Sequence, residues 1–123
     1  MGYMDHIAGI AENDVAVLRK KDVEYAGSWL KRGGVGAYMM LARKIDRIEQ
    51  QVQGVPQYDV ISHAVTDKRE EGLLDDIGDL RRYLLLVEAE IRERLGYVKP
   101  LVPRHIDTTG QAYPFGFDAI AEG

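Results

Sequence analysis

Residues 69–96 have the sequence REEGLLDDIGDLRRYLLLVEAEIRERLG, and this stretch decides the fold. From Leu73 onward, large apolar residues recur every three or four positions, which is the spacing of one face of an α-helix. They are Leu73, Ile77, Leu80, Leu84, Val87, Ile91 and Leu95. Gly96 follows the last of them and is a typical residue just beyond a helix end. The pattern predicts a long amphipathic helix from about Lys68 or Arg69 to Leu95.

Two further long helices are predicted upstream of this one. The first begins near Asp5, a residue type that caps helices, carries apolar residues at helical spacing and ends before Gly27. The second runs from about Ala37 to Gln53. A short helix within Tyr58 to Thr66 is expected in the connection that follows.

The predicted fold is all-α, a bundle of three principal helices, because no stretch alternates polar and apolar residues convincingly enough for a strand. Residues 1–96 form the helical domain, and residues 97–123 form an extended tail rich in proline, glycine and aromatic residues. Each helix carries more apolar surface than a three-helix unit readily covers. We therefore expect a homo-oligomer, a dimer or larger.

The composition excludes several classes of protein. The 123 residues, 46% hydrophobic and 29% charged, are ordinary for one soluble globular domain. The chain has no cysteine, so a disulfide, a thiolate nucleophile and a zinc–sulfur site are excluded. No apolar run is long enough to span a membrane and the N-terminus does not resemble a signal peptide, so we expect no membrane partner and a cytoplasmic location. A net charge of −4 argues against general nucleic-acid binding.

The charges are unevenly distributed along the chain. Residues 19–47 contain eight bases and three acids, whereas residues 67–79 contain six acids and two bases. The first segment suits contacts with phosphates, and the second suits a divalent cation. Within the second, Glu71, Asp75 and Asp79 recur every four residues, which places three carboxylates on one side of a helix. They form either a site for a hard metal ion or a solvated helix face, and a charge pattern alone favours the solvated face.

A glycine-rich loop, residues 27–36, separates the first two long helices. Its four glycines allow backbone conformations that bring amide groups close to a ligand. It lacks the Gly-Lys-Ser/Thr ending of a Walker-type phosphate loop, so the glycines alone are a weak signal. Trp29 and Tyr25 offer an aromatic wall on which a base stacks, although a tryptophan beside such a loop is more often a packing anchor.

Four ordered motifs in residues 23–86 resemble those of a known family. They are Glu24-Tyr25-Ala26-Gly27-Ser28-Trp29, Gly33-Gly34-Val35-Gly36-Ala37-Tyr38, Lys44-Ile45-Asp46-Arg47-Ile48, and Glu71-Gly72 with Asp75, Asp79 and Tyr83. Together they resemble the nucleotide modification associated domain 1 family of phages and bacteria, which is similar to the all-α MazG-like nucleotide pyrophosphohydrolases. Three positions depart from the family pattern: Glu24 and Ala26, because Glu24-Tyr25-Ala26 stands in place of Asp-Tyr-Gly, and Arg82, which stands in place of Asn.

The resemblance implies a Mg2+ (or Mn2+) cofactor held by carboxylates. Two registers are open: Asp46-x-x-Glu49 with Asp76-x-x-Asp79, matching the acidic motifs of MazG-like enzymes, or the ladder Glu71, Asp75 and Asp79. Asp79 is common to both. The candidate metal ligands are Glu49, Glu71, Asp75, Asp76 and Asp79, and the candidate catalytic residues are Glu71, Asp75 and Asp79.

The candidate substrate-binding residues come from the first and third motifs and the loop between the helices. Lys44 and Arg47 are expected to contact phosphates, with Lys31 and Arg32 in reserve. The full set is Tyr25, Ser28, Trp29, Lys31, Lys44 and Arg47.

The resemblance predicts that residues 1–96 form a nucleotide-binding domain. The expected function is magnesium-dependent hydrolysis of a (deoxy)nucleoside triphosphate to monophosphate and pyrophosphate, in the host cytoplasm if the chain is phage-encoded. Two alternatives stay open. One is a non-catalytic phage protein that sequesters a nucleotide or cyclic nucleotide, and the other is a helical structural or interaction protein.

Overall fold

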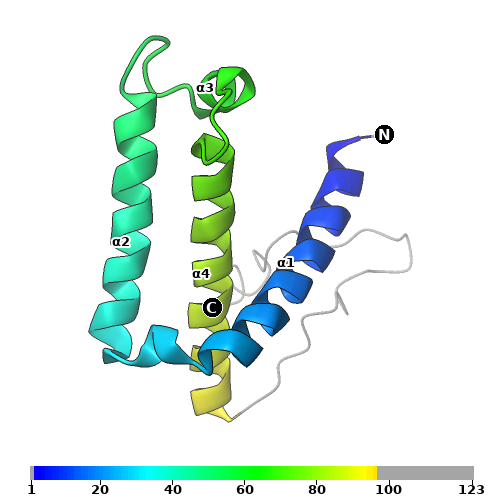
Figure 1. Ribbon diagram of the computed structural model, residues 1–123, viewed down its shortest axis with the longest axis vertical. Helices are drawn as coiled ribbons and strands as arrows, with labels where there is room; N and C mark the ends of the chain where they lie inside the picture. The colour runs from blue at the N-terminus through cyan, green and yellow to red at the C-terminus, as the bar shows by residue number, and fades with distance from the viewer. Residues whose placement is uncertain (1, 97–123) are drawn as a thin grey trace, which may run out of the picture. The chain divides into compact units, whose positions relative to one another are not determined.

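The computed structural model describes residues 2–96, which are mainly helical (Figure 1). The elements are α1 (Tyr3–Tyr25), the 3-10 helix η1 (Ser28–Leu30), α2 (Gly33–Val52), α3 (Val60–Thr66) and α4 (Leu73–Leu95). No strand occurs between residues 2 and 96, and the predicted all-α class with three long helices is confirmed. The predicted tail, residues 97–123, lies outside the described residues.

The chain divides into two compact units, Met1–Glu90 and Ile91–Gly123. Helix α4 begins in the first unit and ends in the second. The contacts that join α1 to α4 and α2 to α4 lie within the first unit. Gly96 follows α4 with a φ of 70°, the left-handed conformation expected after a helix end.

The start of α4 is set by a capping carboxylate. Asp67 Oδ2 accepts a hydrogen bond from the backbone N–H of Leu73 at 2.8 Å, and Asp67 Oδ1 accepts one from the backbone N–H of Arg69 at 3.0 Å. A Cβ on Gly72 would lie 2.5 Å from Asp67 Oδ2, so only glycine allows this approach. The helix therefore begins later than the apolar and acidic pattern predicts, and Glu71 precedes it.

The first two long helices also differ from their predicted limits. Asp5 Oδ2 accepts a hydrogen bond from the backbone N–H of Gly2 at 3.2 Å, so Asp5 lies inside the first turn of α1 and is not the N-cap. Ala26 and Gly27 have φ values of 48° and 76°, and this left-handed corner ends α1 where predicted. Helix α2 begins at Gly33, earlier than expected, because the glycines that follow adopt helical conformations.

Helices α2 and α4 run side by side in opposite directions (Figure 1). The buried apolar side chains among the described residues are Ala37 and Val52 on α2 and Leu73 on α4. Against these three, 21 large apolar side chains are exposed. The predicted apolar stripes are thus only partly covered: Tyr38 and Ile45 on α2 are 64% and 50% exposed. No helix within residues 2–96 has the length and apolar character needed to cross a bilayer.

Candidate functional site

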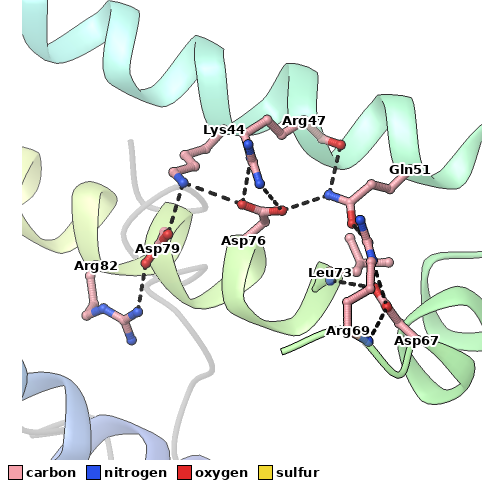
Figure 2. Close-up of polar contacts among 9 residues, drawn as sticks. All are labelled: Lys44, Arg47, Gln51, Asp67, Arg69, Leu73, Asp76, Asp79 and Arg82. Carbon is pink, nitrogen blue, oxygen red and sulfur yellow. Dashed lines mark hydrogen bonds and ion pairs between the residues drawn. The ribbon is translucent and has the colours of Figure 1, made fainter. Parts of the chain in front are cut away.

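A buried carboxylate joins α4 to α2. Asp76 on α4 is 2% exposed and accepts hydrogen bonds from three side chains of α2 (Figure 2). The donors are Arg47 Nε at 2.9 Å, Gln51 Nε2 at 2.7 Å and Lys44 Nζ at 3.4 Å. Positions 44, 47 and 51 share one face of a helix, so the spacing of α2 itself presents all three donors to one acceptor.

These contacts shift the titration of both partners. Burial acts to raise the pKa of Asp76, but the hydrogen bonds from Arg47 and Gln51 outweigh it, so the pKa lies below its ordinary value. Burial acts to lower the pKa of Lys44, but the hydrogen bond with Asp79 and the nearby charges reverse the effect, so the pKa is raised. Both groups are therefore held in their charged forms.

A second buried carboxylate joins α1 to α4. Asp14 on α1 is 1% exposed and accepts two hydrogen bonds from Arg81, from Nε at 2.6 Å and Nη2 at 2.9 Å. Arg82 Nη1 donates a third at 3.1 Å. The hydrogen bonds from Arg81 chiefly lower the pKa of Asp14, against the opposing effect of burial. A carboxylate this deeply buried requires such pairing, because an unpaired buried charge is strongly destabilising.

Asp79 connects the two buried carboxylates. Its Oδ2 lies 3.0 Å from Lys44 Nζ, and its Oδ1 lies 3.0 Å from Arg82 Nη2 (Figure 2). Because Lys44 also contacts Asp76 and Arg82 also contacts Asp14, a continuous chain of ion pairs runs from α1 through α4 to α2. The chain extends beyond Asp76, because Gln51 Nε2 donates to Asp76 and Gln51 Oε1 accepts from an arginine, Arg69, that is paired with Asp67.

A cavity of about 980 Å³ lies between α1, η1, α2 and α4. This volume is at the upper end of the range of small-molecule sites, roughly 300–1,000 Å³. Its aromatic lining is formed by Tyr25, Trp29 and Tyr83, and Met39 and Met40 add flexible apolar surface. The bases that line it are Lys21, Lys31, Arg32, Arg43 and Arg82, and the acids are Asp22, Asp46 and Asp79.

Four of the six predicted substrate-binding residues line this cavity. Tyr25, Ser28, Trp29 and Lys31 come together there, as does the reserve candidate Arg32. Lys44 and Arg47 do not belong to the lining, and both are paired with carboxylates of α4.

The predicted metal ligands are dispersed. Asp79 lines the cavity, Asp76 is enclosed by its three donors, and Glu49, Glu71 and Asp75 are exposed. Within residues 2–96, no three His, Asp or Glu side chains converge as a group that would hold a metal ion. Of the acids in the two candidate sets of metal ligands, Asp46 and Asp79 line the cavity, and Asp79 is already paired with two cations. Both candidate sets of metal ligands therefore stay predictions.

The structure adds residues to which the sequence had given no role. Arg43 lines the cavity between Met39 and Asp46, and positions 39, 43 and 46 share one face of α2. That periodicity is present in the sequence, but a mixed polar and apolar face gives no signal of a cavity until α1 and η1 are placed beside it. Arg82 and Tyr83 on α4 also line the cavity, and their place in its wall was not predictable for the same reason.

Comparison with models of known families, with curated proteins and with solved structures found no match. The likeness of the four motifs to the phage and bacterial family thus stays a resemblance.

Lowering the pH below about 4 is expected to destabilise the fold through Asp14 and Asp76. The pKa of each carboxyl is below its ordinary value of 3.8 in the folded chain, so each contributes stability above that value and loses it as the pH falls through the folded pKa. Urea unfolding at about pH 6 and about pH 3 measures the effect. In Asp14→Asn and Asp76→Asn, the free energy of unfolding should be lower at the higher pH and should change less between the two.

The matched control is Glu12→Gln, which removes one acid from the exposed surface of α1. It should keep the wild-type pH dependence. Equal pH dependence in all four proteins would contradict this role for the two buried carboxylates.

Proposed function

We propose that this chain binds a nucleotide in the cavity between α1, η1, α2 and α4. The observation that carries the proposal is the combination, in one cavity, of an aromatic wall with cations that lack carboxylate partners among the described residues. Lys31, Arg32 and Arg43 line the cavity and form no ion pair with any residue between 2 and 96.

The charge of the cavity favours an anionic ligand. Five bases and three acids line it, whereas the whole chain has a net charge of −4. A concave surface that is locally positive on an acidic protein concentrates anions, and arginine is well suited to grip phosphate oxygens with two donors at once. Phosphate groups of the ligand would lie against Arg32 and Arg43.

The apolar part of the lining suits the nucleobase of the ligand. Trp29 and Tyr25 belong to adjacent segments, η1 and the end of α1, and both line the cavity. An aromatic side chain stacks on any base, because every base has a π-face. Such stacking supports binding of nucleotides as a class and does not select among bases.

Hydrolysis is the part of the expectation that the described geometry supports least. A magnesium site requires several oxygen ligands around one ion. Here Asp79 accepts from Lys44 and Arg82, and Asp46 is the other acid from the predicted motifs in the cavity lining. We therefore place nucleotide binding without turnover ahead of magnesium-dependent pyrophosphohydrolysis, and one experiment addresses both.

Nucleotide binding can be followed through Trp29. It is the single tryptophan of the chain and it lines the cavity, so its fluorescence should change when a base stacks nearby. Titration with ATP, dATP, GTP and cyclic AMP should show saturable changes for at least one of them. In Arg32→Gln and Arg43→Gln, affinity should fall about ten- to hundredfold, because a hydrogen bond to a charged group contributes about 1.5–3 kcal/mol.

The matched controls are Arg19→Gln and Lys20→Gln, which remove exposed bases of α1 that do not line the cavity. They should bind as the wild type does. Pyrophosphate release, measured in the same mixtures with magnesium, separates turnover from binding alone. The proposal fails if no nucleotide alters the Trp29 signal, or if the control variants weaken binding as much as the cavity variants.

We also propose that a second copy of this chain covers part of the exposed apolar surface. Three buried apolar side chains do not make a core for the described helices, and 21 large ones remain in contact with solvent. Tyr38 and Ile45, two turns apart on α2, and Leu84 on α4 are about half exposed or more and do not line the cavity. Two antiparallel helices with one exposed apolar face pair with their own copy as a four-helix arrangement.

Sedimentation velocity tests whether two copies of the chain associate. The wild type should sediment as a dimer or a larger species, and the double variant Ile45→Glu with Leu84→Glu should shift toward the monomer. The control is Val65→Glu on α3, which places the same charge at a side chain that is 75% exposed. A monomeric wild type would contradict the proposal, as would an equal shift in the control.

A further inference from the structure

Asp79 occupies an unusual position on the cavity wall. Its carboxylate is 40% exposed, yet both of its oxygens accept from cations at 3.0 Å, Oδ2 from Lys44 and Oδ1 from Arg82 (Figure 2). Asp76, by contrast, is only 4% exposed in its side chain and faces α2. Asp79 is thus a carboxylate that lines the cavity and is held by two cations.

Each of those cations has a second, buried partner. Lys44 Nζ also lies 3.4 Å from Asp76 Oδ1, and Arg82 Nη1 also donates to Asp14 Oδ1 at 3.1 Å. If the Asp79 side chain turned away, both cations would keep a carboxylate partner and no buried charge would be left unpaired. Breaking these two contacts therefore costs less than breaking a buried pair.

The Arg82 guanidinium lies close to a glycine of α4. A Cβ on Gly78 would lie 3.2 Å from both Nη atoms of Arg82, so the guanidinium lies close against the backbone of α4. From there its two terminal nitrogens reach different carboxylates, Asp14 with Nη1 and Asp79 with Nη2. Both Arg82 and Asp79 line the cavity.

We propose that Lys44 and Arg82 form a phosphate subsite, which the Asp79 carboxylate fills in the free protein. A phosphate group of the ligand displaces this carboxylate and pairs with the two cations. The proposal rests on nucleotide binding in the cavity. A phosphate, like a carboxylate, presents several acceptor oxygens and pairs with arginine and lysine in the same geometry. Asp79 then limits affinity, because its negative charge both occupies the two cations and repels the incoming phosphate.

This role gives a prediction opposite to that of a metal ligand. If Asp79 holds magnesium for catalysis, its neutralisation weakens metal-dependent binding and removes turnover. If it is a displaceable occupant, its neutralisation strengthens the binding of phosphate groups in the absence of metal.

The experiment compares the wild type with Asp79→Asn in EDTA, with ATP and inorganic pyrophosphate as the probes and Trp29 fluorescence and calorimetry as the readouts. Asp79→Asn should bind ATP at least about tenfold tighter, because removing one like charge within a few ångströms of the phosphate relieves a repulsion worth about fivefold in affinity at the dielectric of water and up to about a thousandfold at that of a protein surface. Asp79→Ser, which also shortens the side chain, should tighten binding in the same direction. Circular dichroism confirms that both variants are folded.

Glu12→Gln is the matched control, since it removes an exposed acid of α1 outside the cavity, and it should leave the affinity unchanged. Tighter binding in both Asp79 variants, or binding that appears only in them, supports the proposal. Unchanged or weaker binding beside a wild type that binds ATP overturns it and leaves the proposed function in place. No binding by any of the proteins overturns both.

Discussion

A carboxylate that is removed from water has to be paired with cations, and this constraint arises twice among the described helices. Asp14 on α1 is paired with two arginines of α4, and Asp76 on α4 accepts hydrogen bonds from three side chains of α2. With so few buried apolar side chains, these polar contacts do much to hold the three long helices in place. They also fix which face of each helix is turned toward the cavity.

The same constraint divides the cations into two groups. Lys44, Arg47, Arg81 and Arg82 are engaged by buried or half-buried carboxylates, whereas Lys31, Arg32 and Arg43 line the cavity without an acidic partner in residues 2–96. The cations held in ion pairs are thus distinct from the cations proposed to bind the ligand, except at Lys44 and Arg82. Both of these reach Asp79, where the network meets the cavity wall. A ligand that displaced Asp79 would therefore act on the contacts that join all three helices.

Much of the fold was predictable from the period of the apolar residues, which located the three long helices and the end of α4 at Gly96. The start of α4 was not predictable, because it depends on a hydrogen bond from the backbone N–H of Leu73 to the side chain of Asp67, six residues earlier, and no local sequence pattern indicates this contact. At the site, Tyr25, Ser28, Trp29 and Lys31, which the aromatic and glycine-rich motif brought together as candidates, line one cavity, and their role in binding stays a prediction. The partners of Lys44 and Arg47 were not predictable, because a lysine or arginine on a helix gives no sign of whether a carboxylate 29 or 32 residues away will face it. The roles of Glu49, Glu71 and Asp75 as metal ligands remain predictions.

The buried carboxylates hold the long helices to one another, and a double-mutant cycle between Asp14 and Arg81 measures this contribution. Free energies of unfolding would be measured by urea denaturation for the wild type, Asp14→Asn, Arg81→Gln and the double variant. The account predicts a coupling energy of about 1–3 kcal/mol, with the double variant less destabilised than the sum of the single variants. Effects that add to within about 0.3 kcal/mol would contradict it, because they would show that α1 is held to α4 by something other than this pair.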